Sequence, residues 1–221
     1  ACRYLDERSK SKEPFFLYLA YNAPHDPIQP KPEWLEKVKA RQPGISEKRA
    51  KLVALIEHLD DGIGKVLAKL DETGLAKNTL VVFSSDNGGV VGNEANNGPW
   101  RSGKTHMYEG GLRVPCVVRW PDHIAPGSHS NRVALLMDIL PTALEIVGQP
   151  APPNIDGVSL LPTLRGEAQP EPVRDLYFVW REGGLLHQGD CTEALRQGDW
   201  KLVRDNLFAP IELYNVKDDP Q

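Results

Sequence analysis

The longest regular pattern in the chain is a stretch between residues 46 and 70 in which apolar residues recur every three or four positions. This spacing places the apolar side chains on one face of a helix. Gly74 lies just beyond the stretch and favours a helix end, because glycine readily adopts the left-handed conformation found after helix C-termini. The pattern predicts an amphipathic helix whose apolar face carries Leu52, Leu55, Ile56, Leu59, Ile63, Val66, Leu67 and Leu70.

Three other runs are apolar without alternation and predict strands at residues 15–21, 80–83 and 114–120. An uninterrupted apolar run is typical of a strand that is buried on both faces of a parallel sheet. The first two runs flank the predicted helix, which gives a strand–helix–strand unit with a right-handed crossover and parallel strands. The carboxyl ends of these two strands would then meet at one edge of the sheet, where ligands bind in such folds.

Polar side chains follow both strands at this predicted edge. Asp86 and Asn87 come after residues 80–85, and His25 comes after residues 15–21. A carboxylate beside a carboxamide offers hard oxygen ligands, which suit calcium or magnesium far better than zinc or copper. The alternative is an Asx turn, in which Asp86 and Asn87 bond their own backbone and the glycines that follow supply positive φ angles. The residues alone leave both interpretations open.

A polar, glycine-rich segment at residues 88–111 comes next and is longer than an ordinary connection, which favours a functional loop. Within it, residues 98–105 match the nucleotide-binding pattern G-x-x-x-x-G-K-[ST]. That motif needs a strand before it and a helix after it, because the helix N-terminus and the backbone N–H groups hold the phosphates. Loop-like sequence flanks it on both sides instead, so a P-loop NTPase is disfavoured.

What remains of this motif is Lys104, a cation with three donors that can reach an anionic oxygen. An isolated lysine would be interpreted as a solvated surface residue. In company with His25, Asp86 and Asn87, however, it completes a set consisting of metal ligands, a proton carrier and a cation. Such a set points to the chemistry of sulfate or phosphate esters.

The second half of the chain predicts shorter elements. Asp138 could cap a short helix that Gly148 closes. The following segment holds six prolines up to Pro172 and is interpreted as a connector. Beyond it, short apolar runs separated by turn residues predict a small antiparallel sheet. The predicted organisation is an α/β core at residues 1–150, a connector at 151–173 and a sheet subdomain at 174–221, with strands at 176–180, 200–203 and 211–214.

Composition narrows the possible partners. The 221-residue chain has a formal net charge of -4 and no long run of like charge, so neither nucleic acid nor an anionic membrane is an expected partner. No apolar segment approaches the roughly 20 residues that span a bilayer. Cys2, Cys116 and Cys191 are widely separated and form no metal-binding pair, so a cysteine-based zinc site is not expected.

The chain resembles the type I sulfatases of the arylsulfatase class, within the alkaline phosphatase-like superfamily. The resemblance covers nearly the whole sequence, and the order and spacing of its blocks fit the family. Its most specific block is the lysine loop with the E-G-G-x-R-x-P tail that follows. The matching blocks are residues 14–21 running into Pro24 and His25, residues 84–88, residues 101–104 with 108–115, and residues 198–202 with 212–215.

The resemblance implies a partial α/β/α sandwich of the alkaline phosphatase-like type with a small carboxyl-terminal antiparallel sheet. It implies that Asp86 and Asn87 ligate calcium in preference to magnesium, and that His25 and Lys104 contact the sulfate and act in catalysis. His106 has no comparable role and is interpreted as a loop histidine. The implied activity is that of a sulfuric ester hydrolase acting on a small-molecule or carbohydrate sulfate ester, in a periplasmic or secreted protein.

The sequence also departs from the family pattern. Family members carry a C/S-x-P/A-x-R motif whose Cys or Ser becomes formylglycine, and this sequence contains none. An early pair of aspartates and a further Lys and His are missing too. The formylglycine is therefore expected from an upstream segment, and residues 1–221 alone are expected to be inactive and to bind calcium weakly, because calcium takes 6 to 8 oxygens.

Two other functions stay open at this stage. One is a phosphatase, phosphodiesterase or phosphonate hydrolase of the same superfamily, and the other is a non-catalytic binding protein with the same fold. The substrate is also open, because it depends on loops whose sequence is not diagnostic. Residues 180–184 and His187 are candidates for lining the entrance to the site.

Overall fold

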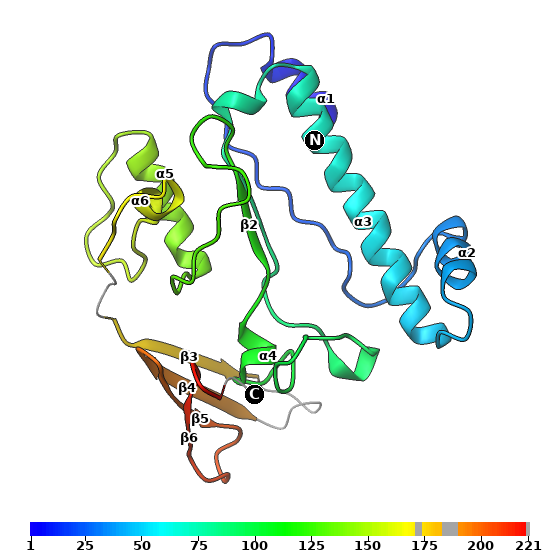
Figure 1. The fold of residues 1–221 in the computed structure, drawn as a ribbon, viewed down its shortest axis with the longest axis vertical. Helices are drawn as coiled ribbons and strands as arrows, with labels where there is room; N and C mark the ends of the chain where they lie inside the picture. The colour runs from blue at the N-terminus through cyan, green and yellow to red at the C-terminus, as the bar shows by residue number, and fades with distance from the viewer. Residues whose placement is uncertain (171–173, 183–189, 220–221) are drawn as a thin grey trace. The chain divides into compact units, whose positions relative to one another are not determined.

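A computed structural model describes residues 1–170, 174–182 and 190–219 (Figure 1). The chain divides into two compact units. The first unit consists of Ala1–Thr79 with Gly89–Asn96, and the second consists of Leu80–Gly88 with Asn97–Gln221. The family resemblance led us to expect a mixed α/β fold with an antiparallel sheet near the carboxyl end, and both features are present.

The first unit is built on the long helix α3, Glu47–Glu72, which Figure 1 shows as the longest element. Ser46 caps it, because its hydroxyl accepts the backbone N–H of Arg49 at 3.1 Å. The helix gives way to Gly74, whose φ of 73° lies in the left-handed region. The helix predicted from the apolar spacing is therefore confirmed.

Two further helices pack against α3. Helix α2, Pro32–Arg41, contributes Val38, which is fully buried with Ala50 and Ala54 of α3. Small side chains at these positions let the two helices approach closely. Helix α1, Cys2–Arg8, also contacts α3 and buries Leu5. Two single 3-10 turns, η1 at Ala76–Asn78 and η2 at Val91–Asn93, complete the unit.

The predicted strand at residues 15–21 is wrong, because this segment is irregular and no described residue pairs with it as a strand. Phe16 and Tyr18 are 82% and 80% exposed. An apolar run becomes a strand only where a neighbouring strand takes up its backbone hydrogen bonds. The predicted parallel strand–helix–strand unit is wrong for the same reason.

The second unit begins with β1, Val81–Ser84, which pairs in antiparallel register with β2, Cys116–Arg119. Both strands lie where the apolar runs predicted them. The short helix α4, Glu109–Leu112, precedes β2 in the chain. The glycine-rich segment therefore begins shortly after β1 and ends, through α4, shortly before β2, the strand that pairs with β1.

A helical segment follows β2 and consists of η3, Leu136–Asp138, α5, Ile139–Ile146, and α6, Leu161–Leu164. Asp138 occupies the N-cap of α5 as predicted, but its carboxylate is fully buried and serves other partners. It accepts the backbone N–H groups of Leu135 at 2.8 Å and Val158 at 2.9 Å, and it pairs with Arg174 at 2.8 Å. This carboxylate thus joins three separate stretches of chain.

The carboxyl-terminal sheet has four antiparallel strands in sequence order. The three predicted strands are confirmed, and the structure adds β4, which sequence reasoning missed. One face of the four-stranded sheet carries the buried residues Ala194 and Val203, which pack against Met107 and Tyr108 of the glycine-rich segment. The strands are β3, Leu176–Arg181, β4, Cys191–Gln197, β5, Trp200–Arg204, and β6, Glu212–Asn215.

Candidate functional site

Asp86 and Asn87 lie directly after β1, as the sequence predicted. The Asp86 side chain is exposed, and no hydrogen bond or ion pair joins its carboxylate to another described residue. Asn87 is half-buried and donates its side-chain amide N–H to the carbonyl of Gly88 at 2.9 Å. That bond occupies the nitrogen of the carboxamide and leaves its oxygen for another partner. Both side chains therefore offer oxygen ligands at the end of β1.

These two ligands fit part of a calcium site. Carboxylate and carboxamide oxygens are the ligand types that calcium prefers, but the ion takes 6 to 8 of them. Among the described residues there is no cluster of three or more His, Cys, Asp or Glu side chains that could hold a metal ion. Asp86 and Asn87 are thus two side chains whose oxygens are of the type that a calcium ion takes.

Glycines hold the lysine loop against the end of β1. Gly88 donates its backbone N–H to the carbonyl of Gly111 at 2.9 Å. A β-carbon at Gly88 would lie 1.8 Å from the carbonyl oxygen of Gly110, and one at Gly111 would lie 2.0 Å from that of His106 and 2.6 Å from that of Gly103. Only residues without a side chain allow backbones to approach so closely. The sequence Glu-Gly-Gly is thus explained by packing.

Lys104 lies in the turn that these glycines support. The backbone N–H of His106 donates to the carbonyl of Gly103 at 3.1 Å, which closes the turn around Lys104. The side chain of Lys104 is half-buried, and no hydrogen bond or ion pair links its ammonium group to another described residue. A half-buried cation without a carboxylate partner is suited to receive an anion. The turn residue Thr105 has a φ of 77°, in the left-handed region.

The P-loop interpretation fails in the structure, as the flanking sequence predicted. Residues 104 and 105 form a turn within an irregular segment, and the next helix is the four-residue α4. A helix that short has no N-terminal row of N–H groups that could hold several phosphates. The pattern at residues 98–105 is therefore coincidental.

His25 belongs to the first unit, whereas Asp86, Asn87 and Lys104 belong to the second. It is exposed in an irregular turn, with its backbone N–H donated to Asn22 at 2.9 Å. Its Nδ1–H donates to the carbonyl of Asp26 at 2.8 Å, which leaves Nε2 as the atom that can meet a substrate. The Asp26 carboxylate in turn accepts the side-chain amide of Asn93 at 2.6 Å.

Aromatic and charged side chains fasten the lysine loop to the carboxyl-terminal sheet. The Glu212 carboxylate accepts the hydroxyls of Tyr214 at 2.6 Å and Tyr108 at 2.7 Å, and these bonds hold the pKa of Glu212 below its usual value. Arg101 stacks 3.8 Å above the Tyr108 ring and donates to the Tyr214 hydroxyl at 2.7 Å. Burial, and then the bond to Glu212, raises the pKa of Tyr108.

The sequence did not predict three more contacts between the lysine loop and the carboxyl-terminal part of the chain. His106 Nδ1 lies 2.8 Å from Asp205 Oδ1, so this histidine is not an isolated loop residue. The Thr192 hydroxyl donates to the carbonyl of Thr105 at 3.0 Å. Lys201 donates to Glu109 at 2.7 Å in a buried pair. The partners are 87 to 99 positions apart, so only the polar identity of Lys201 in a strand could have signalled one of them.

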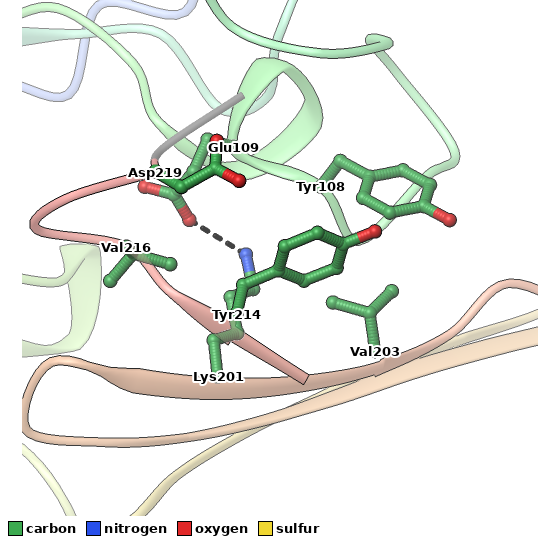
Figure 2. Close-up of a pocket in the computed structure, with 7 residues that line it drawn as sticks. All are labelled: Tyr108, Glu109, Lys201, Val203, Tyr214, Val216 and Asp219. Carbon is green, nitrogen blue, oxygen red and sulfur yellow. Dashed lines mark hydrogen bonds and ion pairs between the residues drawn. The ribbon is translucent and has the colours of Figure 1, made fainter. Parts of the chain in front are cut away.

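The small pocket beside this contact cannot hold a substrate. It has a volume of about 10 Å³ and is lined by Tyr108, Glu109, Lys201, Val203, Tyr214, Val216 and Asp219, as Figure 2 shows. A volume of that size holds one water molecule at most. Of the predicted entrance residues, Trp180, Arg181 and Glu182 are described, whereas residues 183, 184 and 187 lie outside the described part.

Two family profiles match the chain and together cover it. The profile described as "Sulfatase" matches residues 1–149, and the profile described as "N-sulphoglucosamine sulphohydrolase, C-terminal" matches residues 100–221. The fold described above also matches that of solved sulfatase structures. The chain is therefore a member of the sulfatase family, of the type I class within the alkaline phosphatase-like superfamily.

Individual relatives agree with this assignment. N-acetylgalactosamine-6-sulfatase of Mus musculus is 35% identical over 84% of this chain and 35% of its own length. The crystal structure of Ps i-CgsB in complex with k-i-k-neocarrahexaose matches 99% of this chain and 47% of that chain, with a TM-score of 0.86 and 32% identity. The phosphonate monoester hydrolase SpPMH from Silicibacter pomeroyi matches 76% of this chain and 35% of that chain, with a TM-score of 0.62 and 28% identity.

The chain thus spans between a third and a half of the length of these relatives. No helix among the described residues is both long enough and apolar enough to cross a membrane.

Proposed function

We propose that the complete product of the gene carrying this sequence hydrolyses sulfate monoesters, and that a carbohydrate sulfate is the substrate. The observation that carries the proposal is the half-buried ammonium group of Lys104, which has no partner among the described residues and is held by glycine contacts next to the Asp86–Asn87 turn. Family membership and the names of two relatives, one of which contains N-acetylgalactosamine and the other neocarrahexaose, support a carbohydrate sulfate as the substrate.

In this proposal Lys104 and His25 contact the sulfate group. Lys104 stabilises the negative charge that grows on oxygen as the S–O bond breaks, and His25 can exchange a proton at Nε2 because its Nδ1–H is already donated to Asp26. Asp86 and Asn87 bind calcium, which withdraws charge from the sulfate oxygens when it is present. The nucleophile, a formylglycine by resemblance to the family, comes from outside residues 1–221.

The first test is the hydrolysis of 4-nitrocatechol sulfate and of a 6-sulfated N-acetylgalactosamine by the wild-type gene product and by Lys104→Ala. We expect kcat/KM to fall about 100- to 1,000-fold, the usual loss when a group that stabilises transition-state charge is removed. Lys65→Ala is the matched control, because Lys65 is exposed on α3 and forms an ion pair with Asp61 at 2.5 Å. Equal rates in Lys104→Ala and wild type would refute the role of Lys104.

A phosphonate monoester hydrolase is the second candidate, and the similarity to SpPMH is the specific observation that favours it. The discriminating assay compares aryl sulfate, aryl phosphate and aryl phosphonate monoesters of the same leaving group. A sulfatase should turn over the sulfate with the highest kcat/KM. Preference for the phosphonate would replace the proposed reaction, and no turnover of any ester would favour a non-catalytic binding protein.

Calcium binding can be tested without an activity measurement. Removal of divalent ions with EDTA should lower the melting temperature of the complete gene product, and calcium should restore it better than magnesium. Asp86→Ala should abolish this restoration, because it removes one of the two oxygen ligands on this chain. For residues 1–221 expressed alone, we expect neither sulfate ester hydrolysis nor a calcium-dependent change in melting temperature.

A further inference from the structure

Exposed and buried positions alternate along β5, and Lys201 occupies a buried position, where an apolar residue is usual. Trp200 and Leu202 are exposed, whereas Lys201 and Val203 are buried on the other face. Lys201 is only 2% exposed, and burial lowers the pKa of its ammonium group. A lysine is almost never fully buried unless it is paired. The strand therefore places a charge where the packing of the sheet does not require one.

The partner of Lys201 lies on the lysine loop. Its Nζ donates to Glu109 Oε1 at 2.7 Å, and the Glu109 side chain is 9% exposed. Figure 2 shows Lys201 pointing from the sheet toward Glu109, with Tyr214 and Tyr108 beside it. The free energy lost when two charged groups leave water can equal the free energy gained from their attraction. A buried ion pair of this kind therefore adds little to the stability of the fold. A role in fixing geometry is the alternative explanation.

Glu109 is the first residue of α4, and the two glycines after it carry the turn of Lys104. Gly110 donates its backbone N–H to the carbonyl of Arg101 at 2.9 Å. Gly111 packs directly against the carbonyl groups of Gly103 and His106. If Glu109 moves, the backbone of Gly110 and Gly111 moves with it. These contacts then shift the residues that flank Lys104 on both sides.

We propose that Lys201 is a positioning residue for Lys104: its buried bond to Glu109 sets the place of the Gly110–Gly111 backbone and so of the turn that presents Lys104 to the substrate. This inference rests on the proposed function for its catalytic consequence. The mechanical link between β5 and the turn rests only on the contacts described above. The two parts can therefore be tested separately.

The mechanical link is tested by hydrogen exchange in the complete gene product. Lys201→Met should speed the exchange of the amides of residues 101–107, because the turn loses the contact that fixes α4. Arg174→Met is the matched control, since it breaks a second acid–base pair with a buried carboxylate, Asp138–Arg174, whose bonds among the described residues do not involve residues 101–107. Equal exchange of residues 101–107 in Lys201→Met and wild type would overturn the inference.

The catalytic consequence is tested with a double-mutant comparison. Lys201→Met should lower kcat for the aryl sulfate about 10- to 100-fold, the loss expected from a misplacement of about 1 Å. In the Lys104→Ala background, the same substitution should lower kcat no further, because its effect passes through Lys104. Arg174→Met should lower the melting temperature and leave kcat unchanged. Equal losses with and without Lys104 would show that Lys201 affects kcat independently of Lys104 and would overturn its positioning role.

Two further variants guard against simple misfolding. Lys201→Arg keeps the charge and should restore part of kcat relative to Lys201→Met. If Lys201→Met does not fold, Lys201→Met/Glu109→Gln removes both buried charges and is expected to fold, yet the turn should still exchange faster than in wild type. If Lys104→Ala leaves hydrolysis unchanged, the proposed function fails, while the exchange result still decides whether Lys201 positions the turn.

Discussion

The turns that carry Lys104 and His25 are supported in different ways. Around Lys104, close backbone contacts from Gly111 combine with bonds from Thr192 of β4 and from Asp205, which directly follows β5. Around His25, the bonds of the histidine itself are local, the turn is exposed, and one side-chain bond, from Asn93 to Asp26, reaches a distant stretch of the chain. The difference shows that the cation of the proposed site is built into the packing of the second unit, whereas the proton carrier is held by its immediate neighbours.

The largest effect should come from breaking the glycine packing behind the lysine turn. Gly88→Ala would bring a methyl group to 1.8 Å from the Gly110 carbonyl oxygen, so the backbone must shift, at a cost of about 3 kcal/mol in the free energy of unfolding. Urea denaturation of the complete gene product measures this change. Gly64→Ala is the control, because a β-carbon at this position of helix α3 would meet nothing within 4 Å.

In Gly64→Ala the free energy of unfolding should rise by about 0.5 to 1 kcal/mol, since alanine loses less conformational freedom in a helix than glycine. A Gly88→Ala protein that is as stable as wild type would mean that the close approach of the two backbones does not hold the lysine turn. The packing of the glycines would then not distinguish the Lys104 turn from the His25 turn.

A smaller and pH-dependent effect should come from Glu212, which ties the lysine loop to the sheet. Because hydrogen bonds lower the pKa of Glu212 in the folded state, its ionised form is stabilised by folding. That contribution is fully present above the unfolded pKa of about 4.3 and is lost as the pH falls through the lowered folded pKa. Glu212→Gln should therefore cost about 1 kcal/mol at pH 7, limited by solvent screening of this third-exposed side chain.

The measurement is the urea midpoint of wild type and Glu212→Gln at pH 7 and at pH 3. The difference between the two proteins should shrink as the pH falls from 7 to 3, because protonation of the wild-type carboxylate removes its charge-dependent contribution. Tyr108→Phe removes one of the two hydroxyl donors and should reproduce part of the effect. A difference of the same size at both pH values would contradict the proposed charge dependence.

The smallest effect on stability is expected at His25. His25→Ala should change the free energy of unfolding by less than about 0.5 kcal/mol, because the side chain is exposed and its bond to Asp26 is local. Hydrolysis of the aryl sulfate should nevertheless fall about 100-fold if His25 transfers a proton. A stability loss as large as that of Gly88→Ala would show that the two turns are supported alike.

The sequence predicted the elements whose pattern is local. Helix α3 follows from its apolar spacing together with Ser46 and Gly74, and β1 follows from the apolar run at residues 80–83. Strand β4 was missed because Glu193 and Arg196 interrupt its alternation. The strand expected at residues 15–21 failed because strand formation depends on a partner, which the run itself does not reveal.

The site shows the same division. The positions of Asp86, Asn87 and Lys104 in turns beside glycines were predictable, because each follows from its immediate neighbours. The bond between Glu109 and Lys201 joins residues 92 positions apart, and the bond between His106 and Asp205 joins residues 99 apart. The residues around each of these side chains give no information about which distant residue it contacts. The roles of His25, Lys104, Asp86 and Asn87 in binding and catalysis remain predictions.

The close packing of Gly88, Gly110 and Gly111 also limits how this site can change during evolution. A side chain at any of the three would collide with a backbone carbonyl, so these positions cannot be used to reshape the pocket. New substrate preferences must arise where side chains can vary without moving the lysine, such as the partly exposed pair of His106 and Asp205. The glycines thus separate the part of the site that is fixed from the part on which selection for a new ester can act.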